Sequence, residues 1–108
     1  MKQLALILTI LIMVAASAFA ESWTGKLVDA VCKVSHEGDD PPMPACAATA
    51  ETHLFGIELS DAKMLALDAA GNEKASNAVK SVRKTNPRAV VTGSRDGQFV
   101  KVETIEIQ

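Results

Sequence analysis

The sequence has very few aromatic side chains: one Trp, three Phe and no Tyr among 108 residues. Phe19 lies at the end of an N-terminal apolar run, so Trp23, Phe55 and Phe99 are the aromatic residues of the remaining chain. Proteins that bind bases or sugars by stacking need several exposed aromatic faces. We therefore expect no extended stacking surface.

An excess of positive charge is also missing. The chain has 11 basic and 13 acidic side chains, and without Lys2 of the N-terminal run ten basic residues remain against thirteen acidic ones. Nucleic-acid binding rests on a net basic surface and on counterion release, so this balance argues against a nucleic-acid partner. The basic residues that gather in one stretch, Lys80, Arg83, Lys84 and Arg88, are explained by a solvated helix end, where the helix dipole favours cations.

Catalytic motifs are absent as well. The sequence contains no nucleophile elbow, no phosphate-binding loop and no metalloprotease motif. It also lacks the Cys-x-x-Cys arrangement that lowers the pKa of a thiol in redox enzymes. The sequence therefore favours a non-enzymatic protein and does not identify a ligand.

Residues 1–20 have the pattern of a secretory signal peptide. Lys2 precedes an apolar run over residues 4–14, and small side chains occupy the positions that a signal peptidase recognises. The apolar run is too short to span a membrane stably. We expect cleavage after Ala20, a periplasmic or secreted location, and one domain over residues 21–108 with no membrane span after cleavage.

Four stretches of the remaining chain predict five β-strands. Residues 22–29 alternate apolar and polar side chains, as a half-buried strand does. Residues 54–59 and 63–68 are apolar runs joined by a short polar turn, which predicts a hairpin. Residues 88–108 contain two β-branched runs around an Asp-Gly pair, and glycine supplies the positive φ of a hairpin turn at low cost. The sheet is expected to close with this last hairpin.

The last strand changes phase along its length. Val100 and Val102 share one parity, and the two isoleucines that follow them have the other. A regular strand would not bury all four side chains. We therefore predict a β-bulge near Glu103 and Thr104, of the kind that is common where a small sheet curls into a barrel.

One helix is predicted between the third and fourth strands. Asn72 is a suitable N-cap, because its side-chain oxygen can accept hydrogen bonds from the first free amides. Ala75, Val79 and Val82 lie three or four residues apart and form one apolar stripe on a polar helix. The helix is expected to end before Pro87.

Between the first two strands, the alternating pattern disappears over residues 30–53. The prolines within residues 39–44 exclude a strand interior or a helix there. A loop of this length in a compact domain is usually functional or tied down. The alanine-rich residues 45–52 predict a short helix that begins near Pro44.

The predicted order is strand, long loop, strand, strand, helix, strand, strand. A helix between the third and fourth of five strands is the order of an OB-fold, a small and partly open barrel. We therefore predict an all-β protein with one helix, folded as a five-stranded OB-like barrel.

The chain contains five distinctive short motifs: Trp-Thr-Gly at 23–25, Asp-Ala-Val-Cys at 29–32, Leu-Asp-Ala-Ala-Gly-Asn at 67–72, Val-Thr-Gly-Ser-Arg-Asp-Gly at 91–97 and Val-Lys-Val-Glu-Thr-Ile at 100–105. With these motifs, the sequence resembles a family of small secreted bacterial domains of unknown function with an OB-like barrel. The resemblance covers most of residues 22–107 and implies a fold more than an activity. Members carry a cysteine after the first strand, a nearby histidine and a Cys-x-x-x-Cys pair. Cys46 matches one member of that pair, but Ala50 stands at the other, which weakens a metal site inferred from the family.

The two cysteines, Cys32 and Cys46, both lie in the long loop. An even cysteine count in an exported protein favours a disulfide. This bond would close a loop of about fifteen residues and stabilise the fold by about 3 kcal/mol through its constraint on the unfolded chain. Free-thiol chemistry is the least favoured alternative, because the usual redox motif is missing.

The other alternative is a metal site formed by Cys32, His36, Cys46 and His53. Two thiolates and two imidazoles suit zinc in tetrahedral coordination, or copper(I) as a soft set. The separation between Cys46 and His53 is not a standard ligand spacing, and a metal would compete with oxidation after export. The disulfide without a cofactor is therefore the favoured prediction.

The loop between the first two strands and the adjoining barrel face form the expected ligand site, by analogy with other OB barrels. We expect a peptide, a small anion or a partner protein to contact Trp23, Phe55, Phe99 and Lys101. Trp23 has a competing role as a core or rim residue, which is the more common one for tryptophan. No pattern in the sequence specifies an oligomeric state.

Overall fold

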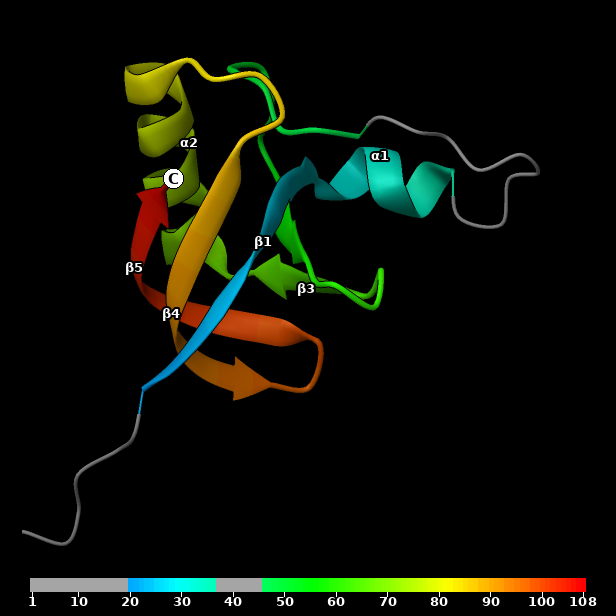
Figure 1. Ribbon diagram of the computed structural model, residues 1–108. Coiled ribbons are helices and arrows are strands. Elements are labelled where there is room, and N and C mark those ends of the chain that lie inside the picture. Colours follow the sequence, from blue (N-terminus) through cyan, green and yellow to red (C-terminus); the bar gives the residue numbers. More distant parts are fainter. Residues whose placement is uncertain (1–19, 37–45) are drawn as a thin grey trace, which may run out of the picture.

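The computed structural model describes residues 20–36 and 46–108 (Figure 1). The predicted signal peptide, apart from Ala20, and the proline-rich residues 41–44 lie outside the described residues. The elements of the described chain are β1 (Glu21–Asp29), α1 (Ala30–Ser35), β2 (Phe55–Glu58), β3 (Met64–Leu67), α2 (Ala69–Val82), β4 (Arg88–Asp96) and β5 (Phe99–Ile107).

The strands close into a barrel in the order β1-β2-β3-β5-β4, with β4 paired back to β1. Paired strands are antiparallel except β3 and β5, which run parallel where Ala66 lies opposite Phe99 and Leu67 opposite Val100. The main helix, α2, connects β3 to β4. This arrangement is the OB-like topology predicted from the sequence, and the fold prediction is confirmed.

Strand β1 pairs with two neighbours in succession, since Lys26 lies opposite both Arg88 of β4 and Glu58 of β2. The predicted alternation is confirmed: Gly25 and Leu27 are buried and Lys26 is exposed. A Cβ atom at Gly25 would lie 2.1 Å from the carbonyl oxygen of Glu58. The absence of a side chain at Gly25 therefore allows β1 to approach β2 closely.

Strands β4 and β5 form the predicted closing hairpin. Its turn contains Gly97, with a φ of +64° that favours glycine. Asp96 pairs with Phe99 next to the turn, and Ala89 pairs with Ile107 at the far end of the hairpin. The Asp-Gly signal therefore locates the turn correctly.

The hairpin contains the predicted bulge. Thr92 pairs with Thr104 and Gly93 pairs with Val102, so Glu103 is an extra residue on β5. Even-numbered residues of β5 face the core before this position, and odd-numbered residues face it afterwards. The bulge prediction is confirmed, because all four apolar side chains of the strand belong to the core or pack against it: Val100, Val102, Ile105 and Ile107.

Helix α2 begins earlier than predicted. Asp68 is the N-cap, and its Oδ1 accepts hydrogen bonds from the Gly71 amide at 2.9 Å and the Val102 amide at 3.2 Å. Asn72 lies inside the helix, where its Oδ1 accepts from the Phe55 amide at 2.8 Å. The prediction of Asn72 as the cap is therefore wrong. Asp68 caps the helix because it follows β3 directly and fastens the helix start to β5 as well.

Helix α1 occupies a stretch where the sequence pattern predicts a loop. Asp29 caps it by accepting a hydrogen bond from the Cys32 amide at 3.0 Å, and none of its residues is buried. The helix predicted over residues 45–52 is wrong for its described part. Residues 46–48 are paired with β1 through an isolated bridge, which overrides the helix propensity of alanine.

The core fills the barrel and the space between the barrel and α2. Ala75 and Val79 of α2 are buried against it. The largest fully buried side chains are Phe55, Leu27, Ile57, Val91 and Val100.

Among the described residues, no helix is both long and apolar enough to cross a bilayer.

Candidate functional site

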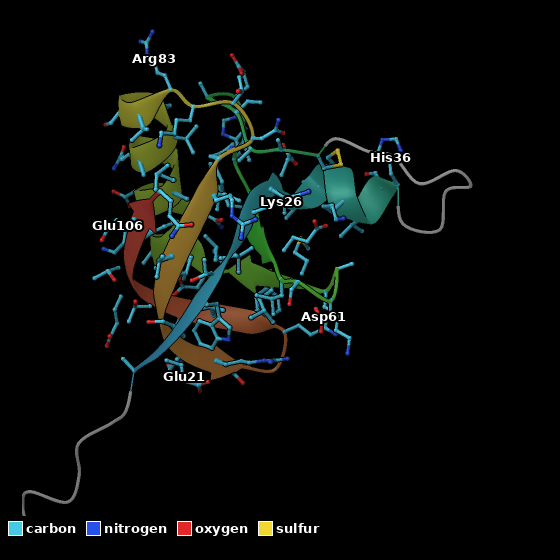
Figure 2. All side chains as sticks on the ribbon, viewed as in Figure 1. Glu21, Lys26, His36, Asp61, Arg83 and Glu106 are labelled. Atoms are coloured by element: carbon cyan, nitrogen blue, oxygen red, sulfur yellow. A yellow bond between two sulfur atoms is a disulfide. The ribbon has the colours of Figure 1, made fainter. Side chains whose placement is uncertain are left out.

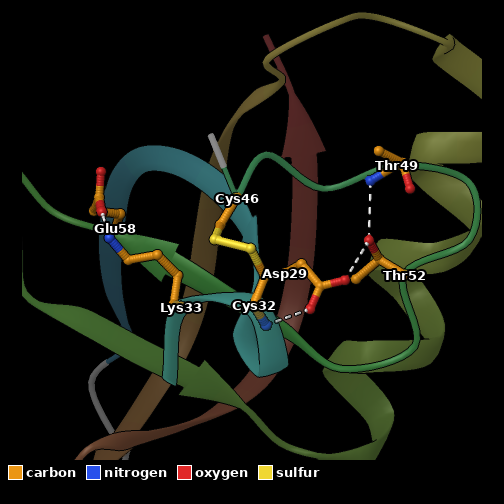
Figure 3. The surroundings of a disulfide bond; sticks show 7 residues. All are labelled: Asp29, Cys32, Lys33, Cys46, Thr49, Thr52 and Glu58. Carbon is orange, nitrogen blue, oxygen red and sulfur yellow. Dashed lines mark hydrogen bonds and ion pairs between the residues drawn. A yellow bond between two sulfur atoms is a disulfide. The ribbon is translucent and has the colours of Figure 1, made fainter. Parts of the chain in front are cut away.

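The connection from β1 to β2 is covalently fastened. The predicted disulfide between Cys32 and Cys46 is present, with the two Cα atoms 5.5 Å apart (Figure 3). It joins α1 to the segment that follows residue 45. Next to it, the ammonium group of Lys33 forms an ion pair with Glu58 of β2. Two adjacent residues in the middle of α1 thus attach the helix to neighbouring parts of the fold.

A buried polar network holds the second half of this connection. The Thr52 hydroxyl donates to Asp29 Oδ2 at 3.1 Å and accepts from the Thr49 amide at 3.0 Å (Figure 3). Thr52 is only 3% exposed. The other carboxylate oxygen of Asp29 caps α1. One carboxylate therefore positions both α1 and the segment around Thr49.

Residues 46–48 add a short strand-like edge to β1. The Asp29 amide donates to the Cys46 carbonyl at 2.7 Å, and the Ala48 amide donates to the Leu27 carbonyl at 3.0 Å. These bonds flank an antiparallel bridge between Val28 and Ala47. In this pattern the facing pair makes no hydrogen bonds with each other, so the N–H and C=O of Ala47 point away from β1.

A groove of about 550 Å³ lies beside this edge. Residues 47–50 form one wall, and Val79, Lys80 and residues 83–86 form the other. Figure 1 shows the connection passing beside the loop that follows α2. Most of the lining is apolar, and Val79 is buried at 5% exposure. We refer to this feature as the α2 groove.

Three cations line the α2 groove: Lys80, Arg83 and Lys84. Arg83 ends the helix in a left-handed conformation with φ 57°, and its side chain projects from that end of α2 (Figure 2). The Lys84 ammonium donates to the Gln108 carbonyl. Between described residues, the ion pair of Lys33 with Glu58 is the sole one, so Lys80 and Arg83 have no carboxylate partner there.

The structure does not gather the predicted ligand-binding residues into one surface. Phe55 is 1% exposed and packs in the core, which corrects its assignment to an accessible face. Trp23 is partly buried against the same core, in agreement with its competing role. Phe99 is 58% exposed, and Lys101 is exposed on the same outward parity of β5. Trp23 therefore lies on the inner side of the barrel wall, whereas Phe99 and Lys101 lie on the outer side.

The alternative metal set is not assembled in this structure. Both sulfur atoms of Cys32 and Cys46 belong to the disulfide, so neither is a thiolate ligand. His36 lies at the end of α1 (Figure 2), and His53 is exposed in the connection before β2. The described residues contain no group of three or more His, Cys, Asp or Glu that could hold a metal ion. Metal binding by the reduced chain stays a prediction.

The residues of the α2 groove are those that sequence reasoning explained in other ways. The basic stretch was attributed to a solvated helix end, and Lys80 does lie in the last turn of α2. The alanines at 47, 48 and 50 were attributed to helix propensity. In the sequence, the groove is indicated only by small residues in the loop and by several cations near the helix end. These two stretches are far apart along the chain, and the fold brings them together.

The fold and the site define a small closed barrel of OB-like topology whose first connection is fastened by a disulfide beside a cationic groove. Comparison of the chain with protein families, curated proteins and solved structures gives no match. The resemblance to a family of secreted OB-like domains therefore stays a prediction.

Proposed function

We propose that the protein is an exported, non-enzymatic binding domain and that its ligand occupies the α2 groove. The observation that carries this proposal is a mostly apolar lining surface combined with two cations, Lys80 and Arg83, that lack carboxylate partners among the described residues. An apolar floor favours an apolar part of the ligand, and unpaired cations favour a negative charge. The proposed ligand is therefore anionic and partly apolar.

The composition of the groove supports binding without catalysis. Among the described residues, its lining contains no His, Asp, Glu or Cys. Nucleophilic catalysis requires an activated nucleophile and a base within hydrogen-bond reach. Among the described residues, the lining offers the hydroxyl groups of Thr49 and Thr85 no His, Asp or Glu as a base.

Two features support export. The first is the signal-like pattern of residues 1–20. The second is the disulfide, because such bonds form and persist in oxidising compartments such as the periplasm. The periplasm or the medium is accordingly the compartment from which the protein should be purified for binding experiments.

The test uses 8-anilinonaphthalene-1-sulfonate, an anionic and apolar dye that becomes fluorescent when it leaves water. The protein, purified without reductant, should bind the dye saturably at one site. The double substitution Lys80→Gln with Arg83→Gln should weaken binding about tenfold, because each exposed cation contributes a modest attraction. Added salt should weaken dye binding to the native protein more than to the double variant.

A matched control removes two positive charges elsewhere. Lys63 and Lys74 are exposed and lie outside the groove. The double substitution Lys63→Gln with Lys74→Gln should leave dye affinity within twofold of the native value. Equal weakening in both double variants would mean that the dye senses net charge alone, and absence of saturable binding would reject the proposed site.

A further inference from the structure

We infer that the ligand of the α2 groove is an extended peptide segment with acidic side chains, which pairs through its backbone with the outer edge of residues 46–48. This inference rests on the proposed function and adds the chemical class of the ligand. It depends on the Ala47 backbone, on the adjacent cations and on the shape of the groove.

The edge offers two backbone groups of one residue, the N–H and the C=O of Ala47. Its N–H and C=O point away from β1 and make no hydrogen bond within the described chain. Ala47 is half-buried and lines the groove. Unpaired backbone groups at a strand edge are a template for a further strand, and several domains bind peptides in this way.

The edge is short, which limits the pairing to one residue of the peptide. The next outward position is Thr49, and its N–H and C=O are already bonded to the hydroxyl and the amide of Thr52. A peptide residue placed opposite Ala47 in antiparallel orientation would both donate to and accept from it. We therefore expect one backbone amide of the peptide to matter far more than its neighbours.

The side chains of such a peptide would alternate between two environments. One parity would face the apolar floor near Val79 and Ala50, and the other would face solvent and the cations at the end of α2. Lys80 and Arg83 have no carboxylate partner among the described residues, so acidic side chains would complement them. The favoured ligand alternates acidic and β-branched apolar residues.

The experiment uses a peptide with fluorescein on its N-terminus, an amidated C-terminus and the sequence Glu-Ser-Glu-Val-Glu-Ser-Glu, in which the single valine favours one register. Fluorescence anisotropy should show saturable binding, and the peptide should displace the anionic dye. A set of peptides, each methylated at one backbone amide, should contain a single position at which affinity falls about tenfold, the loss expected for one hydrogen bond to an unpaired group. The same peptide with Lys in place of Glu should not bind.

The protein provides the complementary variant. Ala47→Pro removes the outward N–H, which takes part in no hydrogen bond between the residues that the structure describes. Proline is tolerated at strand edges of this kind. The variant should keep the native thermal midpoint and dye affinity and lose peptide affinity about tenfold. Ala47→Ser, which keeps the N–H, is the matched control and should bind the peptide normally.

Amide hydrogen exchange supplies a readout that does not depend on Ala47→Pro folding. The Ala47 amide of the native protein should exchange more slowly when the peptide is bound. Dye binding without peptide binding would overturn this inference and leave the proposed function standing, whereas loss of both would reject both. Equal affinity for every methylated peptide would also overturn it, because the groove would then recognise charge and apolar surface without strand pairing.

Discussion

Thr52 and Asp29 are joined by a hydrogen bond of 3.1 Å from the threonine hydroxyl to Oδ2 of the carboxylate. This bond connects the end of β1 to the stretch just before β2. The same carboxylate caps α1 through its other oxygen. The wall of the α2 groove is therefore positioned by a residue of the barrel itself, in addition to the disulfide.

Replacement of Thr52 by valine tests this network. Thr52→Val keeps the side-chain shape but removes the donor to Asp29 and the acceptor for the Thr49 amide. Because the side chain is 3% exposed, the lost partners are not fully replaced by water. We expect the free energy of unfolding in urea to fall by about 2 kcal/mol. The exposed Thr104→Val should change it by less than about 0.5 kcal/mol, and equal effects of the two substitutions would contradict the network.

Removal of the disulfide should destabilise the fold without abolishing it. The double substitution Cys32→Ser with Cys46→Ser releases a loop with a sequence separation of 14 residues. We expect a loss of about 3 kcal/mol, because the unfolded chain gains the entropy that the bond removed. Urea denaturation of the native protein with dithiothreitol should give the same midpoint as the double variant, which should itself be insensitive to dithiothreitol. An unchanged midpoint in the double variant would show that the disulfide does not contribute to the stability of the fold.

Two glycines of the closing hairpin should respond differently to alanine. A Cβ atom at Gly93 would lie 2.0 Å from the carbonyl oxygen of Lys101, so the bulged strands would have to separate. We expect Gly93→Ala to cost about 3 kcal/mol of unfolding free energy. Gly97 has a φ of +64° with open space around it, so Gly97→Ala should cost only about 1 kcal/mol. Urea denaturation compares the two variants, and a larger effect at Gly97 would contradict this account of the bulge.

The barrel was predictable because its signals are local. The alternation of residues 22–29, the Asp-Gly turn and the change of phase before Ile105 each report which side of a strand faces the core. Once five strands and one helix are in order, few topologies remain, and the observed one was among them. The disulfide followed from the cysteine count and from the signal-like pattern of residues 1–20.

The groove was not predictable, because it depends on contacts between distant stretches. The alanines of residues 47–50 favour a helix on propensity, yet the bridge of Ala47 to β1 and the turn that joins Thr49 to Thr52 place this stretch beside α2. The analogy with other OB barrels places Phe55 on the ligand-binding face, yet it is the largest fully buried side chain of the core. Tertiary packing overrides local preference at both places.

At the start of α2, the sequence pattern predicts the wrong N-cap, Asn72, whereas the structure has Asp68. Amide hydrogen exchange can test this assignment. Asp68→Ala should speed exchange of the Gly71 and Val102 amides, which lose their shared acceptor, and leave the Phe55 amide unchanged. Asn72→Ala should speed exchange of the Phe55 amide alone. Each substitution should lower the unfolding free energy by about 1 to 2 kcal/mol. Faster exchange of the first-turn amides of α2 in Asn72→Ala, with no change in Asp68→Ala, would restore Asn72 as the cap.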